Sequence, residues 1–262
     1  MPTLPDLDKL SCAELEKLII KIVYERLKPL GFRKHGKTLH RFVDGDISQV
    51  VYFDRGYRRA DLLLIYLGIR VPECDLMKFI ISEQTEEYYH FGRCNLRSAL
   101  LRDANEDSHN IFFLFQKTGL QPLIDKIIDK LENEVIPAFE VLSNRDNIIN
   151  CKEKYSYFYY HKHLIRLHES MIWGRRGNLD EAAKLFKSHY QDSLAKYNDE
   201  YENGYQKYLY KGDTVTYRNF KTKKDEKVIA THDGYYTIYG ANRGHVDYLE
   251  ELAKELGIDL NE

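Results

Sequence analysis

Apolar residues recur every three or four positions between residues 11 and 28, which is the pattern of a helix with one buried face. Ser11 and Glu14 have the spacing of a capping box, so we predict that the helix begins there. Pro29 and Gly31 predict its end, because proline lacks the amide hydrogen and glycine accepts a left-handed backbone. The apolar face consists of Leu15, Leu18, Ile19, Ile22, Val23 and Leu27.

The pattern then alternates with a period of two, which predicts β-strands. We expect strands over residues 37–43, 47–54 and 60–71, with Asp44-Gly45 as the turn of a hairpin between the first two. The third strand is nearly continuous in apolar residues, so we place it inside the sheet with both faces covered. Residues 88–101 are compatible with a fourth strand, whereas 107–116 are apolar but too short to assign.

A second amphipathic helix is predicted over residues 119–144. Pro137 should kink or end it, because proline cannot bond back to Asn133 and crowds that turn. Helix, antiparallel sheet and helix together indicate an α+β fold, with two helices packed on one face of the sheet. Leu64 in the third strand and Ile127 in this helix are expected to be core positions.

The composition changes after a polar, asparagine-rich stretch at residues 143–154, and 15 of the 21 tyrosines lie beyond residue 154. We therefore predict two domains, 1–146 and 147–262. The second is expected to begin with a tyrosine-rich helical hairpin over residues 155–173 and 179–210. Its second helix carries an aromatic stripe formed by Phe186, Tyr190, Leu194, Tyr197, Tyr201, Tyr205 and Tyr208. A small β-meander over 214–220, 227–231 and 235–239 and a C-terminal helix over 244–256 complete the predicted fold.

Charge and composition exclude several classes of protein. The formal net charge is −2, with 39 Lys and Arg against 41 Asp and Glu, which argues against a dedicated nucleic-acid binder. The four cysteines form no CxxC pair, so they suggest neither a disulfide framework nor a zinc knuckle. The longest apolar run, residues 62–69, is far shorter than the roughly 20 residues that cross a bilayer. The first residues lack the apolar core of a secretory signal, and we expect a cytoplasmic protein.

Several segments of the first half resemble the bacterial domain-of-unknown-function family DUF4304. They are LKPLGFRKHGKTLHRF (27–42), SQVVYFDRG (48–56), LLLIYLGI (62–69), CNLRSALL (94–101) and IPAF (136–139). His40 stands where an aromatic residue is usual. The resemblance covers roughly residues 13–140 and implies a bacterial origin and a helix–sheet–helix domain. It implies no activity, because the family has no catalytic residues to carry across.

The best candidate binding residues are Arg55, Tyr57, Arg58 and Arg59, on the loop between the second and third predicted strands. Guanidinium groups bond carboxylates and phosphates in pairs, so this loop could receive an anion. The alternative is a solvated hairpin end without a ligand, because charged turns are common.

Catalytic and metal patterns are weak. His161 and His168 share a helical face, while His163 points elsewhere, and with Glu169 they do not form the HExxH arrangement of a zinc site. Cys94 and His90 are four residues apart, too far to bond in a strand. No GxSxG elbow or phosphate-binding glycine loop occurs. We therefore expect no catalytic residues, no metal and no cofactor.

Three functions remain open from the residues alone. The first is a non-enzymatic protein-binding module, one form of which is an immunity-type partner that neutralises a toxin. The alternative is a hydrolase whose site assembles from distant residues such as His161, His168 and Glu169. The third is binding of single-stranded RNA by stacking on tyrosines. The first interpretation of the tyrosine stripe is that it packs the two halves of the chain against each other, and the alternative is that it forms an interface with a partner.

Overall fold

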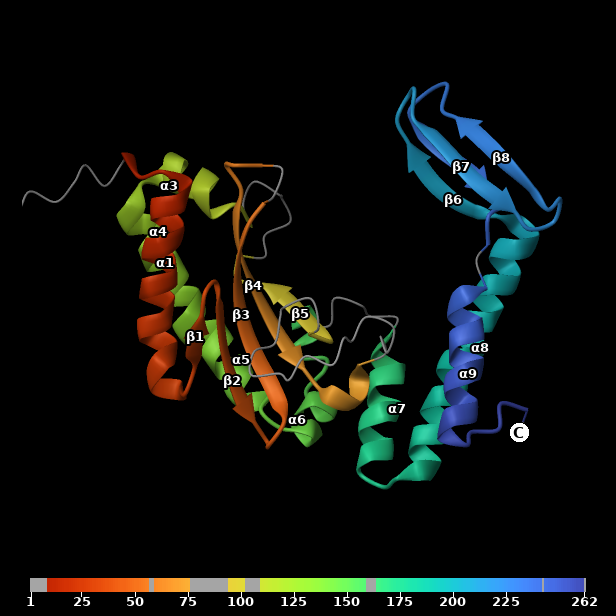
Figure 1. The fold of residues 1–262 in the computed structure, drawn as a ribbon, viewed down its shortest axis with the longest axis horizontal. Helices are drawn as coiled ribbons and strands as arrows, with labels where there is room; N and C mark the ends of the chain where they lie inside the picture. The colour runs from red at the N-terminus through yellow and green to blue at the C-terminus, as the bar shows by residue number, and fades with distance from the viewer. Residues whose placement is uncertain are drawn as a thin grey trace, which may run out of the picture. The chain divides into compact units, whose positions relative to one another are not determined.

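The computed structural model describes residues 9–56, 59–75, 94–101, 109–158, 164–241 and 243–261. The chain divides into two compact units, Met1–His168 (unit 1) and Glu169–Glu262 (unit 2). The division lies inside helix α7 (Ile165–Arg175), later than the domain boundary at 146/147 expected from composition, which stays a prediction. The fold class is α+β, as predicted (Figure 1).

The first helix, α1 (Cys12–Leu27), begins where the capping box predicts. The Ser11 hydroxyl accepts a hydrogen bond from the Glu14 amide at 3.3 Å, and the Glu14 carboxylate accepts one from the Ser11 amide at 2.9 Å. The Ser11 hydroxyl also donates to the Glu14 carboxylate at 2.7 Å, and this bond, together with the one from the Ser11 amide, lowers the pKa of Glu14. A short 3-10 turn, η2 (Lys28–Leu30), and Gly31 with φ of 87° end the helix. Its core face is fully buried at Leu15, Ile19, Val23 and Leu27.

Unit 1 contains a five-stranded antiparallel sheet in sequential order. Its strands are β1 (Arg33–His35), β2 (Thr38–Val43), β3 (Ile47–Arg55), β4 (Leu63–Arg70) and β5 (Leu96–Ala99). The predicted hairpin turn is confirmed: Asp44 and Gly45 have φ of 49° and 82°, and Val43 pairs with Ile47. The apolar strand β4 lies inside the sheet between β3 and β5, as expected.

One face of this sheet is buried in the core of unit 1. The residues on it are Leu39, Ile47, Val51, Phe53, Leu63, Ile65, Leu67 and Ile69, all at most 2% exposed. Gln49 shares this face, and its amide donates to the Phe139 carbonyl at 2.5 Å and the Leu142 carbonyl at 3.3 Å. Leu64 points to the opposite face and is only half-buried, so it is not the core position expected from the sequence.

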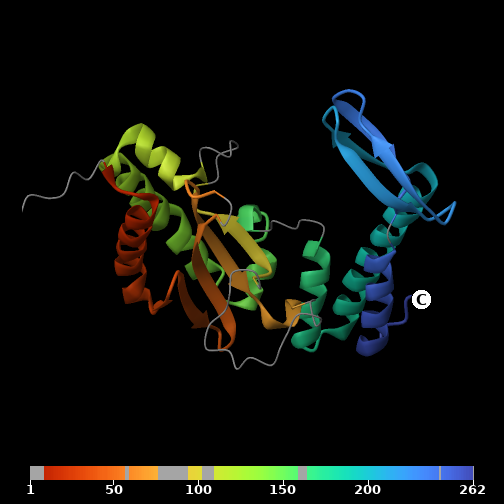
Figure 2. The ribbon, with the colours of Figure 1, turned by 45° about the horizontal axis from the view of Figure 1, so that its top comes forward.

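Helices cover this face (Figures 1 and 2). They are α3 (Ile111–Thr118), α4 (Leu120–Lys130), a π-helical turn η6 (Leu131–Val135), α5 (Ile136–Val141) and α6 (Arg145–Asn150). The predicted helix over 119–144 is thus interrupted by a π turn before Pro137, where proline cannot donate to Asn133. Ile127 is fully buried, as expected. Short 3-10 turns lie at η3 (Pro72–Cys74) and η7 (Ser156–Phe158).

Unit 2 begins within α7 and continues into the long helix α8 (Leu179–Asn203), whose first turn is capped by the Asn178 side chain. Gly204, with φ of 71°, ends α8. The predicted helix up to residue 210 is therefore wrong beyond Asn203, and Tyr205 and Tyr208 belong to strand β6 (Tyr205–Leu209). An added Cβ at Gly204 would lie 2.6 Å from the Thr237 side chain, so this exit requires glycine.

Four strands and a helix complete unit 2. Strand β6 pairs with β9 (Gly234–Ile238), and β7 (Thr214–Asn219) pairs with β8 (Lys224–Ile229). The predicted three-stranded meander thus lacked the strand that pairs with β9. The last helix, α9 (Gly244–Leu256), packs on α8. Across the described ranges, the helices lack the combined length and apolar character that a membrane span needs.

Candidate functional site

Three exposed tyrosines form one surface on strands β6 and β9 and on the residue that follows β6; we call Tyr208, Tyr210 and Tyr235 the tyrosine surface. Tyr208 pairs directly with Tyr235 across the two strands, and their ring centroids are 5.2 Å apart in an edge-on arrangement. Tyr210 lies two residues after Tyr208, and these two rings are 5.4 Å apart. The residues are 46%, 64% and 72% exposed in chain order, unusually large values for aromatic side chains.

Strand alternation explains why these rings face solvent. Leu209 and Ile238 point to the opposite face of the β6–β9 pair and are 3% and 0% exposed, so they form its buried side. Tyr208 and Tyr235 must then point outward, because successive side chains in a strand alternate between faces. The same outward face carries Gln206, whose amide donates to the Thr237 hydroxyl at 2.8 Å. The surface is therefore aromatic with polar tips and edges.

The turns at one end of the tyrosine surface are held by carboxylates. The Asp213 carboxylate accepts from the Tyr210 amide at 2.9 Å, and the Asp233 carboxylate accepts from the Lys211 amide at 2.7 Å. The second bond joins the β6–β7 turn to the β8–β9 turn. Nearby, the Tyr236 hydroxyl accepts from the Thr231 amide, and its hydrogen bonds lower the pKa of Tyr236. The backbone beside the exposed rings is thus well fixed.

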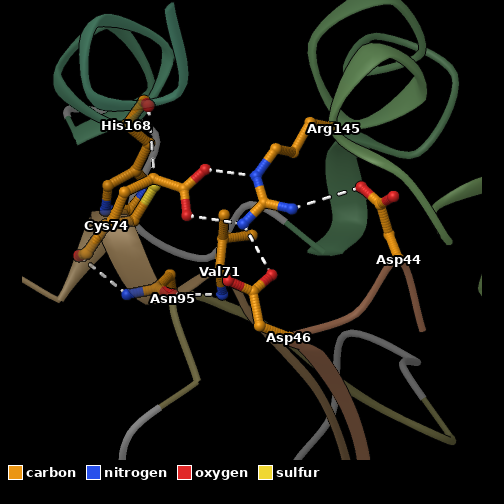
Figure 3. A network of polar contacts seen from close by, with 8 residues as sticks. Asp44, Asp46, Val71, Cys74, Asn95, Arg145 and His168 are labelled. Atoms are coloured by element: carbon orange, nitrogen blue, oxygen red, sulfur yellow. Dashed lines mark hydrogen bonds and ion pairs between the residues drawn. The ribbon is translucent and has the colours of Figure 1, made fainter. Parts of the chain in front are cut away.

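A second polar cluster, the Arg145 network, lies in unit 1. The Arg145 guanidinium donates to both oxygens of Glu73, at 2.6 and 2.9 Å, and to Asp46 at 2.7 Å. It also lies 3.2 Å from Asp44. Figure 3 shows the guanidinium enclosed by these carboxylates. The hydrogen bonds that Arg145 donates to Glu73 are the main reason that the pKa of Arg145 is raised, so this group stays charged.

Beside the Arg145 network, Asn95 fixes the backbone after β4. Its side chain accepts from the Val71 amide and donates to the Cys74 carbonyl, both at 2.8 Å, and the Cys74 thiol donates to the His168 carbonyl at 3.5 Å (Figure 3). The hydrogen bonds of Asn95, Cys74 and Arg145 described above are all made to other groups of the protein. We interpret the cluster as a clamp that joins the β2–β3 turn, η3 and the start of α6.

The predicted binding loop is described only in part. Arg55 ends β3 and is exposed, and the Arg59 guanidinium lies 3.5 Å from the Asp61 carboxylate, with both side chains more than half exposed. The Gly56 amide bonds to the Leu62 carbonyl at 3.2 Å and closes the loop. Tyr57 and Arg58 lie outside the described residues. The anion-binding role of Arg55, Tyr57, Arg58 and Arg59 therefore stays a prediction.

The residues of the hydrolase alternative are also described in part. His168 and Glu169 are buried on α7, 6% and 7% exposed, whereas His161 and His163 lie outside the described residues. Within the described ranges, no group of three or more His, Cys, Asp or Glu could hold a metal ion. The hydrolase therefore stays an untested alternative.

Three of the four cysteines have the properties of core residues, whereas Cys151 is half-buried. Cys12, Cys74 and Cys94 are buried, and burial raises the pKa of the Cys94 thiol to about 12. A thiol with so high a pKa is protonated at neutral pH and is a poor nucleophile. His90, the partner considered for Cys94 in the sequence, lies outside the described residues.

The sequence pattern pointed to tyrosines but missed which of them form a surface. Tyr208 was placed in a helical stripe, and Tyr210 and Tyr235 were not singled out. The signal that could have found them was Gly204 followed by the alternation Tyr208-Leu209-Tyr210, which is the pattern of a half-buried strand.

Comparison with protein-family models, curated proteins and solved structures finds no match to this chain.

Proposed function

We propose that this chain is a non-enzymatic protein-binding module that binds its partner through the tyrosine surface. The observation that carries the proposal is the exposure of three adjacent tyrosine rings on a rigid pair of strands. Tyrosine is enriched at protein interfaces because it buries a large apolar area while its hydroxyl keeps a hydrogen bond. It also dominates the binding energy of many interfaces, together with Trp and Arg.

Rigidity supports the same proposal. A side chain that is already held loses less conformational freedom when a partner binds, so more of the contact energy appears as affinity. Tyr208 is held edge-on by both Tyr210 and Tyr235, and backbone hydrogen bonds to the carboxylates of Asp213 and Asp233 fix the adjacent turns. Cross-strand aromatic pairs also stabilise a hairpin by roughly 0.2–1 kcal/mol each, but that role does not need the rings to be exposed.

The charge of the chain favours a protein over a nucleic acid as the partner. The net charge is −2, and 18 basic residues balance 18 acidic residues after position 150. Nucleic-acid binding draws most of its affinity from an excess of cations facing phosphates. The bacterial origin rests on the resemblance of residues 13–140 to DUF4304, and the immunity-type form of the proposal rests on an analogy with small bacterial domains of this general type that neutralise secreted toxins.

A quantitative pull-down from native lysate tests the proposal with the full chain as bait. The test variant is Tyr208→Ser/Tyr210→Ser/Tyr235→Ser, and the matched control is Thr216→Ala/Lys227→Ala, an exposed cross-strand pair on β7 and β8. We expect a stoichiometric protein partner with the wild type and the control, and at least a tenfold loss with the triple variant. The proposal fails if no protein partner is recovered or if the triple variant recovers as much as the wild type. Enrichment of RNA in place of protein would favour the stacking alternative.

A further inference from the structure

The strands of unit 2 carry an excess of positive charge. The segment 204–240, which contains β6 to β9 and lies beyond the C-terminal end of α8 (Figure 1), has seven Lys and Arg against four Asp and Glu. The helices of the same unit have the opposite charge, because α8 and α9 together carry ten Asp and Glu against four Lys and Arg. The net charge of the whole chain therefore does not describe this segment, in which the tyrosine surface has positive surroundings.

The four acidic side chains of the segment have partners other than lysine. Asp213 and Asp233 accept hydrogen bonds from the backbone of the two turns. Asp225 pairs with Arg218 at 3.1 Å, and Glu226 accepts from two hydroxyl groups, both at 2.9 Å. Among the residues that the structure describes, none of these four carboxylates forms an ion pair with a lysine of the segment.

Most lysines of the segment are therefore uncompensated. Lys221 pairs with Glu202 at 3.1 Å. The other five are exposed and form neither an ion pair nor a side-chain hydrogen bond with the described part of the chain; they are Lys207, Lys211, Lys223, Lys224 and Lys227. Exposed cations of this kind make the potential positive out to about 8–10 Å, the screening length near physiological salt.

Two of these lysines flank the tyrosine surface in the chain. Lys211 directly follows Tyr210 in the turn after β6. Lys207 directly precedes Tyr208 on β6 and points to the other side of the strand pair, where it is exposed. Consecutive Cα atoms are about 3.8 Å apart, so an acidic group that contacts the rings lies on the order of one screening length from both ammonium groups.

The three rings alone are too small for a stable interface. A fully covered tyrosine buries roughly 150–250 Å², so at their exposed fractions the rings of the tyrosine surface offer roughly 270–450 Å². A standard interface buries about 800 Å² on each side. A partner must therefore also contact the residues around the rings, where the strands are positive.

We infer that the partner of the tyrosine surface is an acidic segment of another protein, which presents aspartate or glutamate side chains beside an apolar or aromatic contact. The inference rests on the proposed protein-binding function and adds the chemistry of the partner. Aromatic rings supply the central contact, and the surrounding lysines steer the encounter and select against basic partners.

Three features favour an acidic protein over RNA. The excess of seven cations over four anions is smaller than the roughly 6–10 phosphate contacts of a typical nucleic-acid site. Six of the seven cations are lysines, whereas arginine is the usual choice for phosphate recognition. The rings of the tyrosine surface also pack edge-on, at 78° and 81°, and do not form a parallel platform for successive bases.

Fluorescence anisotropy with labelled polymers tests the inference on the full chain. The probe is a copolymer of Glu and Tyr, which presents carboxylates beside aromatic rings; the comparison probes are a copolymer of Lys and Tyr and polyuridylic acid. The test variant is Lys207→Gln/Lys211→Gln. The matched control is Lys17→Gln/Lys21→Gln, which removes two exposed lysines from α1 and gives the same net charge.

We expect the wild type to bind the Glu–Tyr copolymer at least about tenfold more tightly than either comparison probe. The test variant should bind it at least about threefold more weakly than the control, and this difference should shrink as NaCl is raised from about 50 to about 500 mM. The inference is overturned if either comparison probe binds as tightly, or if the test variant binds like the control. It is also overturned if sedimentation shows self-association at low salt, because the acidic helices of a second copy then occupy the surface.

The Tyr208→Ser/Tyr210→Ser/Tyr235→Ser variant, measured in parallel, separates this inference from the proposed function. Weaker binding in that variant but not in the lysine variant overturns the acidic partner and retains the tyrosine surface as the contact. Weaker binding in the lysine variant alone refutes the tyrosine surface, and the preference for acidic segments then belongs to the lysines.

Discussion

Replacing Arg145 by alanine should destabilise unit 1 far more than the loss of an ordinary surface charge. The Glu73 side chain is only 9% exposed, and Arg145 supplies two short hydrogen bonds to its carboxylate. The substitution leaves that carboxylate buried without this partner and close to the acidic side chains of Asp44 and Asp46.

The magnitude follows from the burial of each partner. Breaking a buried ion pair by removing one member costs roughly 3–5 kcal/mol, because the remaining charge is uncompensated. The pairs with Asp44 and Asp46 add little, since those side chains are 45% and 38% exposed and exposed pairs are worth about 0–1 kcal/mol. We therefore expect Arg145→Ala to lower the free energy of unfolding by about 3–4 kcal/mol at pH 7.

Urea unfolding followed by circular dichroism measures this loss, and hydrogen exchange of β3 and β4 assigns it to unit 1. The matched control is Arg218→Ala, which removes an exposed pair with Asp225 at 3.1 Å and should cost less than about 0.5 kcal/mol.

A second substitution separates lost charge pairing from lost packing. In the Arg145→Ala background, Glu73→Gln removes the unpaired charge and should recover at least half of the lost stability. The clamp interpretation is refuted if Arg145→Ala costs no more than Arg218→Ala. It is refuted as well if Glu73→Gln recovers nothing.

Three further predictions concern the stability of unit 1. Ile127→Ala should lower the free energy of unfolding, measured with urea, by about 2–5 kcal/mol. Leu64→Ala should lower it clearly less, because only the Ile127 side chain is fully buried. Equal losses would contradict the placement of the core. Ser11→Ala should cost about 1 kcal/mol, as for other lost helix caps, and an unchanged melt would show that the capping box adds nothing. The raised pKa of Cys94, about 12 against the usual 9.0, contributes stability that is fully present below pH 9 and is lost as the pH rises towards 12. Between these two pH values, ionisation of Cys94 lowers the free energy of unfolding by about 1.4 kcal/mol per pH unit. The stability of Cys94→Ala should therefore fall less steeply with rising pH than that of the wild type.

Features set by a few neighbouring residues could be predicted from the sequence. Helix α1 has its capping box within four residues, and the β2–β3 turn depends on Asp44 and Gly45, which adopt left-handed conformations. The apolar strand β4 was correctly placed inside the sheet from its nearly continuous apolar run, although its second face is covered only in part, with Leu64 half-buried. The α+β class followed from these elements together.

Features that depend on distant residues could not be predicted. Arg145 meets Glu73 and Asp44 across 72 and 101 residues, and no local pattern relates them. The end of α8 was missed for a different reason. The tyrosines continue at helical spacing past Gly204, so the predicted helix was extended beyond the glycine that ends it. The tyrosine surface arises from pairing between β6 and β9, which only the fold reveals.

The π turn at Leu131–Val135 allows a run of side chains at four-residue spacing to stay in register with the sheet. Leu123, Ile127, Leu131, Val135 and Phe139 are all buried, yet in a regular α-helix each step of four residues drifts by about 40° around the axis. Four such steps would carry Phe139 about 160° away from Leu123 and out of the core. A π turn has more residues per turn than an α-helix, so it accommodates one extra residue. This reduces the rotation about the helix axis between Leu123 and Phe139. Deleting a single residue from 131–135 would therefore leave a regular α-helix in which Phe139, and the carbonyl that accepts from Gln49, keep nearly the same position relative to α4.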